Sequence, residues 1–133
     1  MANRGHFLRV NDYLRPYDWL ESRNGMFFAI MQRDANLVVY QGGFETGGKG
    51  LWAYSERALE LGDYFAVLQS DGNLCVYRGT GPDDNRGAIW CARSEPMPPR
   101  DDYVLVMRDD GNLCVMVGDR GYVWGWMKKE YLL

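Results

Sequence analysis

Five side chains at alternate positions between residues 32 and 40 combine hydrogen-bonding groups with one apolar group. They are Gln32, Asp34, Asn36, Val38 and Tyr40. A carboxylate only accepts hydrogen bonds, whereas amides and a phenol both donate and accept them. Two neighbouring hydroxyls of a sugar ring need this mixture, and a valine offers a surface for the apolar C–H face of the ring. The spacing therefore indicates a surface that binds a sugar.

A β-hairpin would bring these five side chains together. Aromatic and β-branched residues precede and follow the Asp-Ala-Asn stretch, which is typical of two strands joined by a tight turn. Side chains alternate between the faces of a strand. Leu37 and Val39 should therefore point into the core, while Val38 and Tyr40 point to the opposite face with the amide and the carboxylate.

The same unit occurs three times in the chain. Residues 27–40, 64–77 and 103–116 align without gaps, and each copy runs through a glycine-rich loop to an apolar residue followed by tryptophan. Helix signals are nearly absent, so we expect an all-β fold. Threefold repetition predicts that three tryptophans meet in the core around a central axis: Trp52, Trp90 and Trp124. We expect one domain over residues 1–133, with repeats at approximately 14–55, 56–95 and 96–127.

The second and third copies keep the pattern unequally. The second set is Gln69, Asp71, Asn73, Cys75 and Tyr77. The third set is Arg108, Asp110, Asn112, Cys114 and Met116. In the second, a small and mostly apolar thiol replaces valine, so we expect this set to bind. In the third, a cation faces the carboxylate and the phenol is lost. We expect that set to be inactive, with an Arg108–Asp110 ion pair in the pocket.

Composition excludes several other classes of protein. The formal net charge is −3, and the Lys and Arg residues are scattered singly, which argues against nucleic-acid binding. No segment has the roughly 20 apolar residues that span a bilayer. Three cysteines, each in an apolar run, predict buried thiols rather than a disulfide framework or a metal site.

The N-terminus has no apolar signal region. We expect a cytoplasmic protein, or one exported without a signal peptide, and a secreted one if the chain is a processed form.

Catalysis has little support in the sequence. The single histidine, His6, has no candidate nucleophile in register with it. The three repeated aspartates belong to separate copies, so threefold geometry keeps them apart and prevents paired acid–base chemistry. We therefore expect a non-catalytic protein that uses no metal and no cofactor.

The pattern Gln-x-Asp-x-Asn-x-Val-x-Tyr at residues 32–40 resembles the signature of the bulb-type, monocot mannose-binding lectins related to snowdrop agglutinin. The segment at residues 14–25 resembles the lead-in of that family, so the resemblance covers almost the whole chain. It implies a β-prism II fold, in which three four-stranded antiparallel sheets have pseudo-threefold symmetry and one sugar site each. It also implies mannose or high-mannose glycans as ligands, bound without a metal ion.

The resemblance further assigns a role to each residue of the first set. Asp34 and Asn36 would hold the axial 2-hydroxyl of mannose, Gln32 the 3-hydroxyl and Tyr40 the 4-hydroxyl, while Val38 would pack on the ring carbons. Ala35 stands where many relatives carry a cysteine. The family's disulfide is therefore expected to be absent, which leaves stability to packing of the sheets.

Two further expectations follow from the resemblance. Members of the family often pair by exchanging C-terminal strands, so the tail at residues 128–133 makes a homodimer an option. The degraded third copy keeps an alternative function open, namely a protein-interaction or antimicrobial module on the same fold with weak or no sugar binding.

Overall fold

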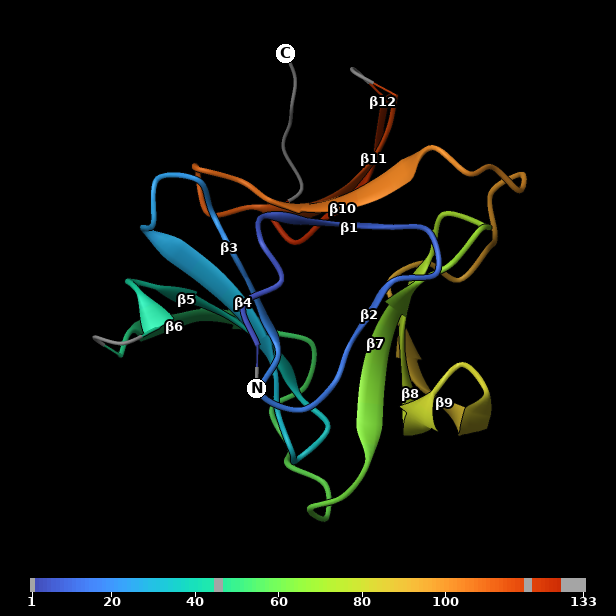
Figure 1. Cartoon of the computed structure of the whole chain (residues 1–133), viewed down its shortest axis with the longest axis horizontal. Helices are drawn as coiled ribbons and strands as arrows, with labels where there is room; N and C mark the ends of the chain where they lie inside the picture. Colours follow the sequence, from blue (N-terminus) through green and yellow to red (C-terminus); the bar gives the residue numbers. More distant parts are fainter. Residues whose placement is uncertain (1, 45–46, 119–120, 128–133) are drawn as a thin grey trace.

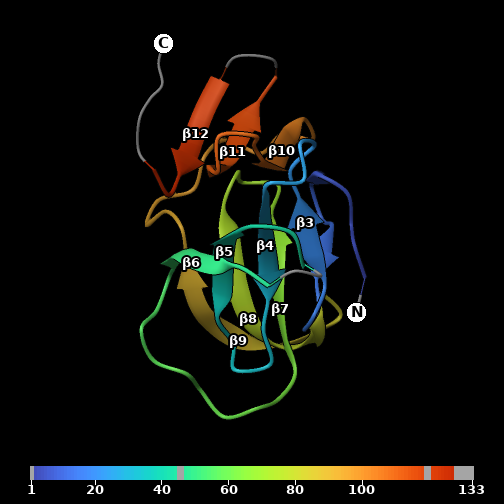
Figure 2. The same cartoon turned by 90° about the vertical axis from the view of Figure 1, so that its left-hand side faces the viewer.

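The computed structural model describes residues 2–44, 47–118 and 121–127, which form β-strands and connecting turns and contain no helix. Twelve strands in these ranges form three four-stranded antiparallel sheets, arranged as the three sides of a prism (Figures 1 and 2). The first sheet contains, in spatial order, β3 (Trp19–Glu21), β4 (Phe27–Met31), β5 (Leu37–Gln41) and β6 (Lys49–Ala53). The second contains β2 (Tyr13–Leu14), β7 (Tyr64–Leu68), β8 (Leu74–Gly81) and β9 (Asp84–Cys91). The third contains β1 (Phe7–Arg9), β10 (Tyr103–Met107), β11 (Leu113–Val117) and β12 (Gly121–Gly125).

The all-β, three-sheet architecture predicted from the sequence is confirmed. The central hairpin of each sheet, β4–β5, β7–β8 or β10–β11, coincides with one copy of the repeated unit. No helix in the described part of the chain is long and apolar enough to cross a bilayer. The tail for which strand exchange was predicted lies outside the described residues.

One N-terminal segment supplies the outer strand of every sheet. Its strands β1, β2 and β3 pair with β10, β7 and β4 respectively. Each carries an aromatic residue followed by a leucine, at intervals of six residues: Phe7-Leu8, Tyr13-Leu14 and Trp19-Leu20. The three leucines are buried in the common core. Because this segment crosses all three sheets, it ties them to one another at the start of the chain.

The core lies between the sheets, as strand alternation predicted. Each second hairpin strand places two aliphatic side chains in the core with no exposed surface: Leu37 and Val39, Leu74 and Val76, and Leu113 and Val115. Trp52, Trp90 and Trp124 meet around the central axis, with ring centroids 5.7–6.0 Å apart in the three pairs. Aromatic pairs in such tilted arrangements add about 0.5–1.5 kcal/mol each beyond the burial of their area.

The cysteine prediction is wrong for two of the three residues. Cys75 on β8 and Cys91 on β9 form a disulfide between directly opposed positions of neighbouring strands. Only Cys114 is the buried free thiol that the apolar surroundings predicted. Irregular pairing of β8 with β9 prevents the two positions from being matched by counting along the sequence. A covalent cross-link therefore stabilises the second sheet in addition to side-chain packing.

Candidate functional site

The turn of each hairpin has the same hydrogen-bonded geometry, which explains its Asp-x-Asn sequence. One carboxylate oxygen of the aspartate accepts the amide N–H of the asparagine two residues later, at 3.1, 3.0 and 2.9 Å in the three copies. Such side-chain bonds are what make Asp and Asn favourable in turns. Each turn therefore fixes its aspartate at the end of the hairpin with the second carboxylate oxygen directed away from the bond that closes the turn.

The residue between Asp and Asn has a left-handed backbone in all three turns. The φ angle is 74° at Ala35, 77° at Gly72 and 91° at Gly111. Glycine adopts such angles without strain, whereas a Cβ makes them costly. The sequence predicted that the first turn would either tolerate a Cβ or be strained, and the φ angle at Ala35 is the strained case.

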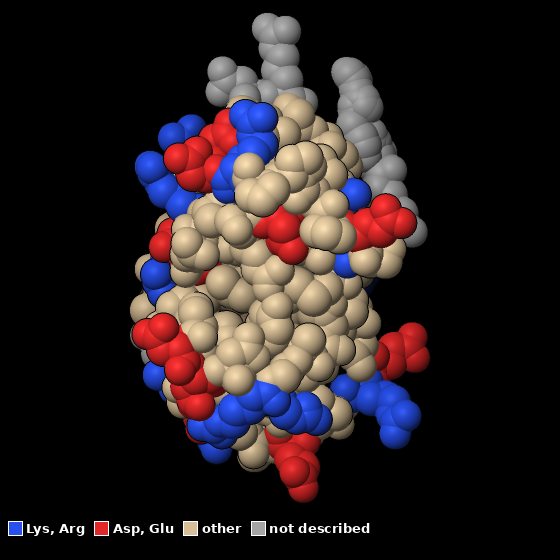
Figure 3. Space-filling model, turned by 90° about the vertical axis from the view of Figure 1, so that its right-hand side faces the viewer, with Lys and Arg blue, Asp and Glu red and all other residues tan. Residues whose placement is uncertain are grey.

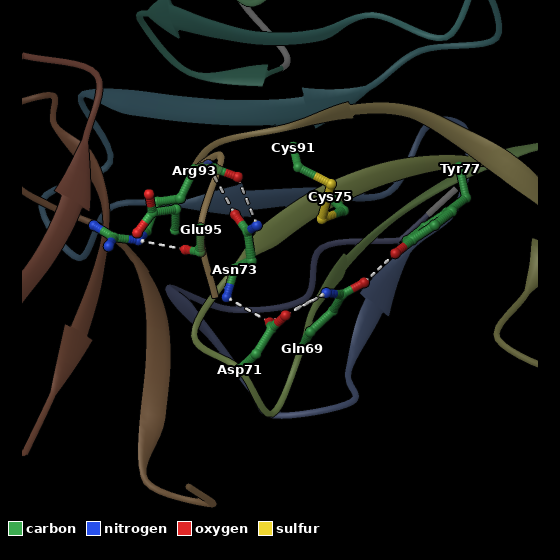
Figure 4. The surroundings of a disulfide bond; sticks show 8 residues. All are labelled: Gln69, Asp71, Asn73, Cys75, Tyr77, Cys91, Arg93 and Glu95. Carbon is green, nitrogen blue, oxygen red and sulfur yellow. Dashed lines mark hydrogen bonds between the residues drawn. A yellow bond between two sulfur atoms is a disulfide. The ribbon is translucent and has the colours of Figure 1, made fainter. Parts of the chain in front are cut away.

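The asparagines anchor the hairpins to the following strands. Asn73 is 6% exposed, and its amide donates to the Arg93 carbonyl while its oxygen accepts the Arg93 N–H, both at 2.9 Å (Figure 4). Asn36 donates to the Ser55 carbonyl at 2.9 Å. Asn112 accepts the Met127 N–H at 3.2 Å. These bonds give the asparagines a structural role that the sequence did not predict.

In the second copy, the polar groups predicted to form a site are joined in one chain of hydrogen bonds. The Tyr77 hydroxyl donates to the Gln69 side-chain oxygen, and the Gln69 amide donates to Asp71 at 3.1 Å (Figure 4). Burial, followed by the nearby Asp71 charge, raises the pKa of Tyr77, so the phenol stays protonated at neutral pH. The three side chains hold one another in a fixed arrangement along a single hairpin face.

These groups line a cavity of about 330 Å³ on the outer face of the second sheet. Val67 of β7 supplies apolar surface to the cavity, and the fully buried Phe65 ring stacks on Tyr77 from behind, with centroids 5.5 Å apart. On the side of the molecule that carries β8 and β9, charged side chains lie mainly toward the margins and the middle is uncharged and hollowed (Figure 3). A hollow with one carboxylate, Asp71, and a few fixed neutral polar groups fits a small ligand that offers hydroxyl donors.

The sequence predicted that Cys75 would contribute to this site, but Cys75 does not line the cavity. It was expected to replace valine as a small apolar contact, but its side chain is 1% exposed and bonded to Cys91 (Figure 4). The apolar contact surface comes instead from Val67, while the buried Phe65 ring supports Tyr77. A hairpin pairs residues at equal distances from its turn, so the position of Phe65 opposite Tyr77 was open to prediction.

The first copy brings its predicted residues together in a related way. The Gln32 amide donates to the Tyr40 hydroxyl at 3.0 Å, and the Tyr40 ring stacks on Phe28 with centroids 5.0 Å apart. The Val38 side chain lies on the same face and is 8% exposed. Phe44 adds a further aromatic surface, because its ring stacks on Trp19 at 4.0 Å and meets Phe28 edge-on. The sequence pattern identified the polar groups but not this aromatic surround.

The third copy contains the ion pair predicted from its sequence. The Arg108 guanidinium lies 3.2 Å from the carboxylate oxygen of Asp110 that does not close the turn. Met116 is paired with Val104, so the stacked tyrosine and phenylalanine of the other two copies are both missing. A cavity of about 480 Å³ remains beside Arg108 and Asp110. The space for a ligand persists there, but the glutamine amide and the tyrosine phenol of the other copies are replaced by Arg108 and Met116.

Metal binding has no visible basis in the described part of the chain. Residues 2–44, 47–118 and 121–127 hold no group of three His, Cys, Asp or Glu side chains placed to coordinate a metal ion.

The chain is similar to lectins in both sequence and structure, although no family model matches it. The B-type lectin plumieribetin of Scorpaena plumieri is 42% identical over 59 residues, which are 42% of this chain and 47% of that protein, so the match spans about half of its length. A lectin from Allium sativum is 30% identical, covering 90% of this chain and 97% of its own, with a TM-score of 0.62. The mannose-specific agglutinin of snowdrop (Galanthus nivalis), solved with methyl-α-D-mannoside, is 28% identical, covering 95% and 99%, with a TM-score of 0.64.

These similarities confirm two predictions made from the sequence. The arrangement of three sheets is the β-prism of the structural relatives. Since the relatives are lectins, the chain is a binding protein and not an enzyme.

Proposed function

Because this chain belongs to the bulb-type lectin family, we propose that it binds mannose or mannose-containing glycans at two sites, without a metal ion. The observation that carries the proposal is the hydrogen-bonded set of Gln69, Asp71 and Tyr77 on the wall of one cavity. The set of Gln32, Asp34 and Tyr40 at the equivalent place forms the other site.

Each group has a definite task in this proposal. Aspartate and asparagine hold the axial 2-hydroxyl of mannose, and this contact separates mannose from glucose, whose 2-hydroxyl is equatorial. Glutamine takes the 3-hydroxyl and tyrosine the 4-hydroxyl. The C–H face of the ring packs on Val38 in the first site and on Val67 in the second.

The affinity of one site for a monosaccharide should be low. A hydrogen bond to a charged group contributes about 1.5–3 kcal/mol and a neutral one about 1 kcal/mol. The loss of rigid-body freedom opposes these gains, so we expect a dissociation constant near millimolar. Sites on two sides of one prism would raise the affinity for a surface covered with glycans, because both can engage it at once.

An NMR titration with methyl-α-mannoside tests the proposal site by site. The expected result is that resonances of Tyr40 and Tyr77 shift while those around Met116 do not, with the same curve in the presence of EDTA. Asp34→Ala should remove the shifts at the first site only, and Asp71→Ala those at the second only. Asp110→Ala is the matched control, since it makes the same change in the third turn and should leave both curves unchanged.

Unchanged spectra at tens of millimolar mannoside would refute sugar binding. Under that outcome, the protein-interaction or antimicrobial role kept from the sequence would be the better account. The double variant with Asp34→Ala and Asn36→Ala would then keep its activity toward such a partner.

A further inference from the structure

The second sheet has a longer outer hairpin than the other two. Strands β8 and β9 contain eight residues each, whereas β5, β6, β11 and β12 contain five. The additional length carries the hairpin past Tyr77 to a tip at residues 82–83, beside the second site (Figure 1). Pro82 and Asn85 of this extension line the same cavity as Gln69, Asp71 and Tyr77.

Hydrogen bonds inside the tip hold its shape without a ligand. Asp84 accepts the Thr80 hydroxyl at 2.9 Å and the Arg86 guanidinium at 2.7 Å. The Arg86 hydrogen bond, followed by that of Thr80, lowers the pKa of Asp84 to about 2, so this carboxylate is ionised at neutral pH. Gly81 lies against Tyr13, since a Cβ there would be only 3.1 Å from the tyrosine hydroxyl oxygen. The conformation of the tip is therefore formed without a bound sugar.

A second amide reaches the cavity from the N-terminal segment. Asn11 lines the cavity and has a φ of 75°, a conformation that costs a non-glycine residue free energy. The conformation is held by the backbone, because the Asn11 N–H donates to the Leu68 carbonyl at 2.7 Å. Within the described structure, the side-chain amides of Asn11 and Asn85 make no hydrogen bond to other residues of the cavity wall. The Asn85 oxygen accepts the N–H of Gly87, which lies outside that wall.

We propose that Asn11, Pro82 and Asn85 form a subsite for a second sugar ring, so that the second site takes a mannose disaccharide or a longer glycan. The inference rests on the proposed function, since the first ring would lie on Gln69, Asp71 and Tyr77. Two amides supply donors and acceptors for the hydroxyls of the second ring, and the proline ring supplies an apolar surface for its C–H groups. The cavity volume of about 330 Å³ lies at the lower end of the range for small-molecule sites.

The subsite distinguishes the second site from the first. The corresponding hairpin of the first sheet, β5–β6, has no extension of its strands, and the groups added there are the rings of Phe44 and Trp19. The two sites of one chain should therefore prefer different parts of a glycan.

Binding of two sugars to the Asp34→Ala variant tests the subsite, because only the second site remains in that background. The probes are methyl-α-mannoside and a panel of methyl mannobiosides with different linkages. Two additional neutral hydrogen bonds, less the cost of ordering the second ring, predict about tenfold tighter binding for at least one disaccharide. Adding Asn85→Ala or Asn11→Gly should abolish this difference and leave methyl-α-mannoside affinity unchanged. Glycine at position 11 keeps the left-handed backbone, so the change removes only the side chain.

Asp83→Ala is the matched control, because Asp83 is exposed at the same tip and does not line the cavity. It should change neither affinity. Equal affinity for the monosaccharide and every disaccharide, or a disaccharide preference that survives both asparagine changes, would overturn the subsite and leave the proposed function standing. Absence of binding by either kind of sugar at this site would overturn both.

Discussion

Cys75 and Cys91 are joined across β8 and β9 at a position that is filled differently in the other two sheets. Val38 faces Ala53 at the equivalent place in the first sheet, and Cys114 faces Gly125 in the third. The three pairs occupy the same register, next to the outward face that carries the sugar-binding pattern. The disulfide of the second sheet therefore fills the space that a Val–Ala pair fills in the first sheet and a Cys–Gly pair in the third.

Replacing the disulfide by the pair of the first sheet, with Cys75→Val and Cys91→Ala, should cost stability and leave sugar binding in place. The cross-link spans 16 residues, and closing a loop of that length in the unfolded chain is worth about 3 kcal/mol. Denaturation in urea measures the change in the free energy of unfolding. Wild-type protein should fall to the stability of the variant when a reductant is added, and the variant itself should not respond. The prediction would be contradicted if the reductant left the free energy of unfolding of the wild-type protein unchanged.

The hairpins and their faces could be predicted because their signals are local. The turn at Asp71 and Asn73, the burial of Leu74 and Val76 and the outward direction of the half-buried Tyr77 all follow from strand alternation and turn chemistry within a dozen residues. Because the unit occurs three times, the prediction of one hairpin became the prediction of three sheets.

The missed features depend on pairing between distant segments. Tyr13 and Trp19 belong to outer strands of two or three residues, too short to be recognised alone. Their spacing of six residues, each aromatic followed by leucine, was a usable signal that repeats at a shorter period than the main unit. The contributions of Asn11 and Asn85 to one cavity had no such signal, since they meet only when the N-terminal segment and the β8–β9 hairpin fold against the same sheet.

The third site should gain mannose binding when its lost groups are restored. Arg108→Gln frees the Asp110 carboxylate from the ion pair at 3.2 Å, and Met116→Tyr supplies the phenol. Adding Val104→Phe should improve the gain, because Tyr40 and Tyr77 both stack on a phenylalanine at that register. The expected result is a third set of shifting resonances at roughly millimolar mannoside. Arg108→Gln alone is the control and should produce little, and failure of the triple variant to bind would show that the remaining cavity has the wrong shape.

Exchanging alanine and glycine in the turns should affect the stability of the two copies unequally. Gly72→Ala places a Cβ 3.0 Å from the Tyr103 ring on a backbone with φ of 77°, so we expect a loss of about 1–3 kcal/mol. Ala35→Gly relieves a left-handed alanine but removes a buried methyl worth about 0.8 kcal/mol, so its net effect should be within about 1 kcal/mol of zero. Thermal unfolding of both variants provides the comparison. An equal loss for the two would mean that the strain at Ala35 is compensated by contacts of its methyl group.

Tyr54→Phe should destabilise the protein near neutral pH and become harmless in strong alkali. The Tyr54 hydroxyl donates to the carbonyl of Ala35, and burial, followed by the Asp34 charge, raises the pKa of Tyr54 from 10 to about 12. The unfolded chain thus ionises first, so the stability from the neutral phenol is complete below pH 10 and disappears as the pH rises toward about 12. Loss of the hydrogen bond should cost about 1 kcal/mol at neutral pH. Urea denaturation across this pH range should show the difference between wild type and variant shrinking above pH 10. A difference that stays constant would mean that the Tyr54 hydroxyl titrates alike in the folded and unfolded chain, and that its bond to the turn contributes nothing to the alkaline limit of stability.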